Sequence, residues 1–383
     1  MVRLGDICYR ITDGSHNPPN GVPNSEFLML SSKNIYDDCI TYEDPRYLSR
    51  EDFEIENKRT QIKPGDVLLT IVGTVGRVAV VPENINNISL QRSVAVIKPK
   101  TDIVMPRFLM YQIQSMKNAL EKEAKGVAQK GIYLKQVENL PIKVFEYDTQ
   151  EKIVLHLDKI CNLIALRKQQ LSQLDVLDKS RFIELFGDII LNPFNWEKEQ
   201  LGMVCDVRDG THDSPQYYET GYPLVTSKNV TGGKIDLTDC SLICEADFNK
   251  INERSKVDIG DIIMPMIGTV GKPVVVDVEP NFAIKNVSLI KFKDHSRVLN
   301  IFIRALLQSG YFDEAVLSKV RGGTQKFISL GDIRKLAVIV PPMALQEQFA
   351  AFVEQTDKSK LVIQQSLEKL ETMKKALMQK YFG

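Results

Sequence analysis

Residues 148–187 predict a single helix that is too long to fold back into one small domain. Apolar side chains recur there at steps of three, four and seven, which is the spacing of one helix face. Asp148 and Glu151 have the spacing of a capping box at the start of this helix, and Gly187 is a natural stop. Polar residues interrupt the apolar face and no long uncharged run is present, which argues against a membrane span. At about 1.5 Å per residue, the helix would be on the order of 57 Å long and would serve as a spacer.

The end of the chain, residues 345–383, has the same pattern. Gln150 and Gly187 return there as Gln346 and Gly383, about 196 residues later. A repeat of this period in a chain of 383 residues leaves room for two copies.

The segments before the two long helices are also duplicated, and the matches keep their order and register. The matched stretches are Asp13–His16 with Asp209–His212, Ser31–Ile35 with Thr226–Val230, Gly65–Gly76 with Gly260–Gly271, and Gly126–Lys130 with Gly322–Lys326. The predicted fold class is therefore α+β, with two β-rich globular domains alternating with two long helices. If the helices pair as an antiparallel coiled coil, the two halves would be related by a pseudo-two-fold axis. The predicted boundaries are 1–147, 148–187, 188–340 and 341–383.

Local patterns predict further elements in the first half. The apolar run 67–81 is broken by Gly73 and Gly76, which predicts a β-hairpin. Residues 107–123 have the apolar spacing of a helix, and residues 140–144 predict a short strand before the long helix.

Composition narrows the class of protein. With 43% hydrophobic and 26% charged residues, the chain resembles an ordinary soluble globular protein, and its first residues have no signal-peptide pattern. The six cysteines form no CxxC pair, so we expect no zinc site and a reducing, cytoplasmic location. The formal net charge is zero, which argues against DNA binding by bulk positive charge. It does not exclude a local basic face, because many acids cluster in residues 36–56.

No motif predicts catalysis or a cofactor. Residues 17–20 resemble the NPP-aromatic motif of amino-methyltransferases, but Asn20 replaces the aromatic ring, so a plain turn is favoured. The run from Gly268 to Lys272 does not have the spacing of a phosphate-binding loop. The chain has four histidines, and the matched positions of His16 and His212 favour a structural or ligand-facing loop over a catalytic one.

Cations, amides and hydroxyls in the matched loops are the side chains that contact base edges and phosphates. A solvated loop without function was the competing interpretation of these positions. The candidate DNA-binding residues of the first half are His16, Asn17, Lys33, Asn34, Thr74, Arg77, Gln91, Arg92, Gln129, Lys130 and Lys135. Those of the second half are His212, Lys228, Asn229, Thr269, Lys272, Lys285, Asn286, Arg321, Thr324, Gln325 and Lys326.

The whole pattern resembles the specificity subunit of type I restriction–modification systems. The resemblance rests on the starts Leu4–Asp6 and Leu201–Met203, on the repeated GD…GTVG and Gly…Gln-Lys stretches, and on the long helix that begins with Gln-Glu in each half. In the second start, Met203 replaces the acid. The resemblance implies that the β-rich domains are target-recognition domains, each reading half of a split, asymmetric site in double-stranded DNA. It also implies that the helices space the two halves and dock two copies of the modification subunit, which methylates adenine. A restriction subunit would supply cleavage, so this chain would itself be non-catalytic.

Two other classes of protein compete with this interpretation. A two-headed coiled-coil adaptor without DNA specificity would also explain the long helices. An autonomous methyltransferase or nuclease is disfavoured because the motifs of both are missing.

Overall fold

The computed structural model describes residues 1–85, 87–124, 131–267, 270–293, 296–316 and 327–383. The chain divides into two compact units, which we describe separately. Unit 1 comprises Met1–Lys168 and Gln365–Gly383, and unit 2 comprises Gln169–Gln364. Each unit therefore contains part of each long helix. Among the described residues, no helix combines the length and the apolar character needed to cross a membrane.

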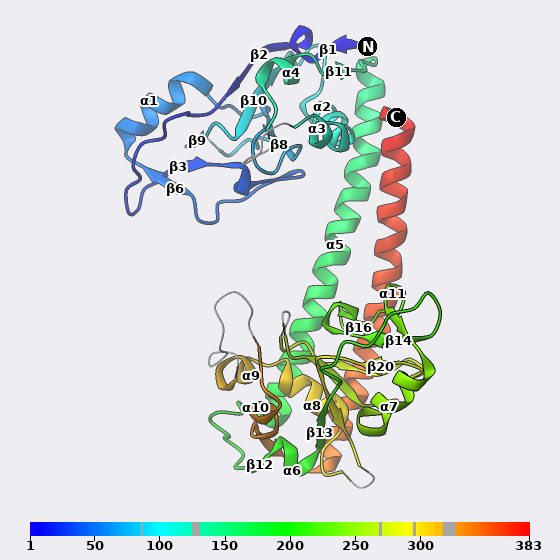
Figure 1. Cartoon of the computed structure of the whole chain (residues 1–383). Helices are drawn as coiled ribbons and strands as arrows, with labels where there is room; N and C mark the ends of the chain where they lie inside the picture. The colour runs from blue at the N-terminus through cyan, green and yellow to red at the C-terminus, as the bar shows by residue number, and fades with distance from the viewer. Residues whose placement is uncertain (86, 125–130, 268–269, 294–295, 317–326) are drawn as a thin grey trace. The chain divides into compact units, whose positions relative to one another are not determined.

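Unit 1 is built on two small sheets (Figure 1). The four-stranded sheet is antiparallel and has the order β2-β10-β7-β8. The three-stranded sheet has the order β6-β3-β9, with β3 and β9 parallel. Two short pairs, β1-β11 and β4-β5, complete the unit. The strands are β1 (Val2–Arg3), β2 (Cys8–Asp13), β3 (Phe27–Leu30), β4 (Ile35–Tyr36), β5 (Cys39–Ile40), β6 (Arg46–Leu48), β7 (Val67–Thr70), β8 (Val78–Val80), β9 (Ile88–Leu90), β10 (Val94–Pro99) and β11 (Pro141–Ile142).

Unit 2 has the same arrangement of strands. Its four-stranded sheet has the order β13-β21-β18-β19, and its three-stranded sheet has the order β17-β14-β20 with β14 and β20 parallel. The pairs β12-β22 and β15-β16 correspond to the two short pairs of unit 1. The strands are β12 (Glu197–Gln200), β13 (Asp206–Asp209), β14 (Tyr222–Val225), β15 (Val230–Thr231), β16 (Lys234–Ile235), β17 (Ser241–Ile243), β18 (Ile262–Pro265), β19 (Val274–Val275), β20 (Ala283–Ile284), β21 (Val287–Lys291) and β22 (Ala337–Val340).

The helices follow the same order in both halves. Those before the first long helix are α1 (Arg50–Thr60), α2 (Pro106–Ser115), α3 (Lys117–Glu123) and α4 (Leu134–Glu138). Those of the second half are α6 (Leu201–Val204), α7 (Glu245–Ser255), α8 (Asn300–Leu307), α9 (Gly310–Ala315) and α10 (Leu330–Arg334). The long helices are α5 (Tyr147–Phe186) and α11 (Met343–Phe382). Short 3-10 turns are η1 (Leu4–Ile7), η2 (Ser32–Asn34) and η3 (Ser227–Asn229).

Several sequence predictions can be compared with these elements. The hairpin is confirmed, because β7 and β8 pair antiparallel around Gly73 and Gly76, both at positive φ. The single helix predicted for residues 107–123 is wrong, because Met116 leaves helical geometry at ψ 0° and separates α2 from α3. Helix α5 begins at Tyr147, so Asp148 lies in its first turn and not at its cap. Gly187 ends α5 at φ 76°, as expected for a left-handed stop.

The Gly-Asp pairs of the repeat have a structural role. Asp66 accepts hydrogen bonds from the Lys63 backbone N–H at 2.8 Å and from Lys98 Nζ at 2.5 Å. Asp261 is bound in the same way by the Asp258 N–H and by Lys291 Nζ, at 2.8 and 2.6 Å. Burial raises the pKa of both carboxyls, and the lysine ammonium opposes that rise.

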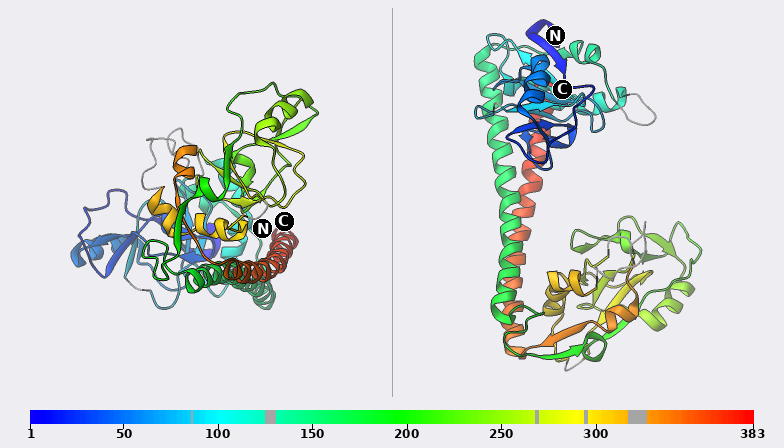
Figure 2. Two further views of the ribbon diagram at one scale, coloured as in Figure 1. Left: turned by 90° about the horizontal axis from the view of Figure 1, so that it is seen from below. Right: turned by 90° about the vertical axis from the view of Figure 1, so that its left-hand side faces the viewer.

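In unit 1 the last turns of α11 lie beside the first turns of α5 and run in the opposite direction (Figure 2). His156 Nδ1 is 3.1 Å from the Tyr381 hydroxyl, and Lys168 pairs with Glu371 at 3.3 Å. The ring of Phe382 packs on that of Phe108 in the unit 1 core, with centroids 5.4 Å apart. The end of the chain is thus part of the core of unit 1.

In unit 2 the last part of α5 packs on the first part of α11. Phe182 and Phe186 pack against Phe349 with ring centroids 5.5 and 5.6 Å apart. Asp178, a polar interruption of the apolar face of α5, binds Lys360 Nζ at 2.6 Å and the Thr356 hydroxyl at 2.7 Å. The polar residue therefore forms a bond between the two helices.

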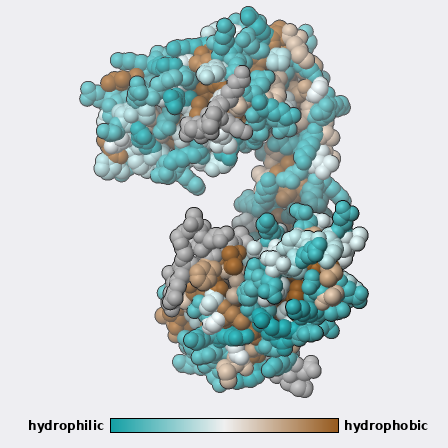
Figure 3. Space-filling model, viewed as in Figure 1, coloured by the Kyte–Doolittle hydropathy of each residue, from teal (hydrophilic) through white to brown (hydrophobic). Residues whose placement is uncertain are grey.

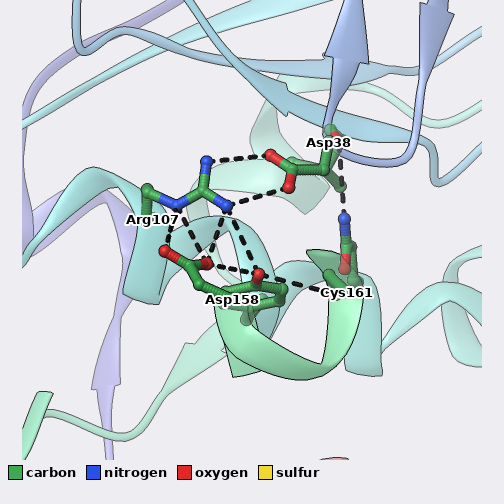
Figure 4. A network of polar contacts seen from close by, with 7 residues as sticks. Asp38, Arg107, Asp158 and Cys161 are labelled. Carbon is green, nitrogen blue, oxygen red and sulfur yellow. Dashed lines mark hydrogen bonds and ion pairs between the residues drawn. The ribbon is translucent and has the colours of Figure 1, made fainter. Parts of the chain in front are cut away.

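A network around Arg107 fixes the start of α2 in unit 1 (Figure 4). Its guanidinium binds both carboxylate oxygens of Asp38, in the β4–β5 turn, at 3.0 and 2.8 Å. It also binds Asp158 of α5 at 2.7 Å, and the Tyr111 hydroxyl donates to the same carboxylate at 2.5 Å. Burial by itself lowers the pKa of Arg107, but the bonds with Asp158 and Asp38 raise it overall. One side chain thereby ties a sheet turn, α2 and α5 together.

The visible face of the molecule carries mostly polar residues. The face in Figure 3 is mostly hydrophilic, with small scattered hydrophobic spots. Isolated apolar side chains of this kind are normal on a protein surface.

Candidate nucleic-acid interface

In unit 1 the candidate residues gather at one end of the four-stranded sheet. Strand β2 ends at Asp13 and β7 ends at Thr70, while β8 begins at Val78 and β10 begins at Val94. Because neighbouring strands are antiparallel, these four positions lie at the same end, which we call the loop end. The candidates in the loops of this end are His16, Asn17, Thr74, Arg77, Gln91 and Arg92.

A buried carboxylate organises the loop after β2. Asp13 Oδ2 lies 2.8 Å from His16 Nε2, and its other oxygen binds Arg59 at the end of α1. The Asp13 side chain is 9% exposed, whereas those of His16 and Arg59 are about half exposed. Both side chains are therefore partly open to solvent while the carboxylate holds them.

The turn η2 adjoins the loop end, because the Ser32 N–H donates to Ser93 Oγ at 3.0 Å. Lys33 is exposed in this turn and pairs with Asp44 at 2.6 Å. Asn34 is buried, and its amide is used within the turn, accepting the Ser31 N–H at 3.0 Å. Asn34 thus shapes the turn, and its contact with DNA stays a prediction.

The remaining positions of the loop end differ in exposure. Thr74 and Arg92 are exposed, and Asn17 is exposed beside the two prolines. Arg77 is half-buried, with its guanidinium stacked 4.7 Å from the centre of the Tyr36 ring. Lys135 is exposed on α4, shortly after Gly131, which forms a bridge with Val72 of the loop end.

Unit 2 repeats the same carboxylate arrangement. Asp209 Oδ2 lies 2.8 Å from His212 Nε2, and Asp209 also binds Arg254 at the end of α7. His212 has a further bond that His16 lacks among the described residues, since its Nδ1 lies 2.9 Å from Asn286 Oδ1. The repeated Asp-Gly-Ser/Thr-His motif therefore makes the same contacts with histidine and arginine in both units.

The other candidates of unit 2 are divided between surface and interior. Lys228 and Lys272 are exposed. Asn229 is 6% exposed and accepts the Thr226 N–H at 3.0 Å, so it shapes turn η3 as Asn34 shapes η2. Its contact with DNA likewise stays a prediction. Lys285 is 9% exposed, and its ammonium donates to Ser214 Oγ at 2.7 Å.

Some predicted residues cannot be placed. These residues lie outside the described part of the chain: Gln129, Lys130, Thr269, Arg321, Thr324, Gln325 and Lys326.

Arg59 and Arg254 belong to this site but were not singled out from the sequence. Each lies far along the chain from the aspartate it binds, so no local motif connects the two. Their matched positions in the two halves, near the ends of α1 and α7, were the one available signal.

The protonation of His212 gives the site a pH dependence. The bonds to Asn286 and then Asp209 raise the pKa of His212 above its usual value. Histidine in the unfolded chain has a pKa of about 6.5, so this stabilisation is complete below that pH and is lost as the pH rises through the folded pKa. We expect a contribution of about 0.5 kcal/mol because the pair is exposed.

Urea unfolding at about pH 6 and about pH 8 measures this contribution. His212→Gln should reduce the loss of stability between the two pH values, and Asn286→Ala should reduce it in part. An unchanged pH dependence in both variants would contradict this assignment.

Within the described ranges, no group of three or more histidine, cysteine, aspartate or glutamate side chains is placed to hold a metal ion. The chemistry available at the loop end is the binding of anions and of hydrogen-bonding edges by cations, amides and hydroxyls.

The fold is found in solved structures of one class of protein. The S subunit of a type I restriction–modification system from M. genitalium matches with a TM-score of 0.60 and 14% identity, over 100% of this chain and 95% of that one. A chain from a structure that describes complex assembly and conformational transition of the type I R-M system matches with a TM-score of 0.53 and 19% identity, over 100% and 96%.

Sequence comparison agrees with this class. Residues 24–176 and 193–372 match the family described as type I restriction modification DNA specificity domain. The MjaIX specificity subunit of Methanocaldococcus jannaschii is 24% identical over 87% of this chain and 82% of its own length. The EcoBI specificity subunit of Escherichia coli is 28% identical over 40% of this chain and 31% of its own length. The chain belongs to the type I restriction–modification DNA specificity family.

Proposed function

We propose that this chain is the non-catalytic DNA-recognition subunit of a type I restriction–modification complex. In this proposal, each unit contacts one half of a bipartite, asymmetric target in double-stranded DNA through the loop end of its four-stranded sheet. In unit 2 the loop end is the end at which β13 stops at Asp209 and β21 begins at Val287. The observation that carries the proposal is the repeated loop of Asp13–His16 and Asp209–His212, in which one aspartate carboxylate binds a histidine and an arginine in both units. Cations held in fixed positions bind phosphates and set the register of a protein on a duplex.

The long helices have a separate role in the proposal. Helices α5 and α11 pair as an antiparallel coiled coil that sets the distance between the two half-sites. The packing of Phe182 on Phe349 and the bond between Asp178 and Lys360 support this pairing. The same helices dock two copies of the modification subunit, and a restriction subunit completes the complex. Because the net charge of the chain is zero, much of the affinity for DNA would come from these partners.

Mapping of N6-methyladenine across the genome tests this function. We expect a two-part motif with an unspecified spacer in cells that express the chain together with its modification subunit. The motif should disappear when the gene is deleted and return when it is restored. If the purified complex also shows no sequence preference among DNA duplexes, the two-headed adaptor without DNA specificity becomes the better interpretation.

A further inference from the structure

The residue that follows β9 in unit 1 and β20 in unit 2 has the same backbone environment in both copies. The Gln91 N–H donates to the Leu30 carbonyl at 2.9 Å, and the Lys285 N–H donates to the Val225 carbonyl at 2.9 Å. On the other side, Gln91 forms a parallel bridge with Ser15, and Lys285 forms one with Thr211. The backbone is therefore fixed from both sides, and only the side chain distinguishes the two copies.

The glycine of the repeated loop explains why the backbone around positions 91 and 285 is the same in both units. A Cβ added to Gly210 would lie 2.9 Å from the Lys285 backbone nitrogen and closer still to the Ile284 carbonyl. A Cβ on Gly14 would meet the backbone of Leu90 and Gln91 in the same way. Because only glycine permits this approach, the loop of each unit lies directly against position 91 or 285, whose side chain differs between the two units.

The next residue follows the same rule. The Arg92 N–H donates to the Ser15 carbonyl at 2.8 Å, and the Asn286 N–H donates to the Thr211 carbonyl at 3.2 Å. Each copy thus carries one amide and one cation, in opposite order along the chain. The number of charges at the loop end is kept while the pattern of hydrogen-bond donors and acceptors changes. That is expected of positions that alter sequence preference without altering phosphate affinity.

The side chains of the varying position have hydrogen-bonding capacity to spare. Gln91 is partly buried, and its side-chain amide makes no hydrogen bond with any of the described residues. The Lys285 ammonium has Ser214 Oγ as its partner, and no carboxylate of the described ranges lies within ion-pair distance of it. A buried ammonium without a counter-charge is costly unless acceptors surround it.

The chemistry of the two side chains indicates which ligands they would take. Glutamine binds the N6 and N7 edge of adenine through two hydrogen bonds, and lysine donates to the O6 and N7 acceptors of guanine. A phosphate contact would instead favour a cation in both copies, as the matched Arg59 and Arg254 provide.

We propose that positions 91 and 285 determine the base read by each unit, with Gln91 selecting adenine in one half-site and Lys285 selecting guanine in the other. This inference rests on the proposed function, because it assumes that the loop end lies in the major groove.

The experiment uses the full chain co-expressed with its modification subunit, and it reads the methylated motif by N6-methyladenine mapping. Gln91→Lys should change the preferred base at one position of one half-site and leave the other half-site unchanged. Lys285→Gln should do the same in the opposite half-site. At the affected position, the preference between adenine and guanine should shift about 5- to 100-fold. Thr101→Lys adds the same charge beyond the opposite end of β10 and should leave the motif unchanged.

A second variant at position 91 distinguishes a change in hydrogen bonding from a change in packing. Gln91→Glu keeps the shape of the side chain but accepts hydrogen bonds, so it should move the preference towards cytosine. An unchanged motif in both Gln91 variants would overturn the proposal. So would an equal loss of methylation at all sequences, which would identify a phosphate contact. If the unaltered complex itself shows no sequence preference, the proposed function fails first, and the two failures are thereby distinguished.

Discussion

Gly210→Ala is expected to destabilise unit 2 by about 3 kcal/mol and to abolish recognition of its half-site. The added methyl group would overlap the Ile284 carbonyl and the Lys285 nitrogen, which are backbone atoms that cannot rotate away. The loop must therefore move away from β20, breaking the bond from the Thr211 N–H to the Ile284 carbonyl, which is 3.0 Å long. Because His212 follows on this loop, its position relative to Asp209 changes as well.

The matched control for this variant is Gly310→Ala in the same unit. Gly310 begins α9, and a Cβ built there meets no atom within 4 Å. Alanine is a better helix former than glycine, so the control should be neutral or about 0.5 kcal/mol more stable. Urea unfolding gives both free energies, and methylation mapping gives the half-site. Equal stability of the two variants would show that the loop tolerates a side chain and that its glycine has another purpose.

The matching strand orders of the two units agree with the predicted duplication, whose strongest markers in the sequence are backbone constraints. Gly14 and Gly210 are fixed by close approaches, and Gly73, Gly76 and Gly271 by positive φ, neither of which depends on the identity of neighbouring side chains. The order of the strands follows these markers in both units. Single-residue patterns were therefore enough to match the loops of the two halves, whereas their position at one end of the sheet comes from the structure.

Individual side chains were harder to assign. Asparagine is a residue type that can read base edges, yet the side-chain amides of Asn34 and Asn229 are each used to close a turn. Whether an amide is used in this way depends on the local backbone and on tertiary packing, and not on residue type alone. Arg59 was not assigned from the sequence, because its partner Asp13 comes near it only when α1 packs beside β2.

Gln150→Leu is expected to destabilise unit 1 by about 3–5 kcal/mol, although glutamine was noticed only as a marker of the repeat. Its buried amide accepts the Met105 N–H at 2.9 Å and donates to the carbonyls of Ile103 and Phe145 at 2.9 and 2.8 Å. Gln346 makes the same three bonds to Leu299, Arg297 and Pro341 in unit 2. Leucine fills the space but leaves one N–H and two carbonyls without partners.

Hydrogen exchange of the full chain tests this effect and locates it. Amides of unit 1 should lose protection in Gln150→Leu while those of the unit 2 core keep theirs. The neighbouring Glu151→Leu changes an exposed side chain and should alter stability by no more than about 0.5 kcal/mol. Loss of protection in both units to the same degree would show that they unfold as one and would contradict a local role.

A second substitution separates hydrogen bonding from packing at this position. Gln150→Glu keeps the volume and the acceptor for the Met105 N–H, but at neutral pH its carboxylate faces two carbonyl oxygens. Burial and this repulsion raise the pKa of the new carboxyl in the folded state above its unfolded value of about 4.3. The penalty relative to the unaltered chain should therefore shrink as the pH falls through the folded pKa, because the protonated acid can donate one bond. A penalty that does not change with pH would mean that packing, and not the amide, attaches the long helix to the sheet domain.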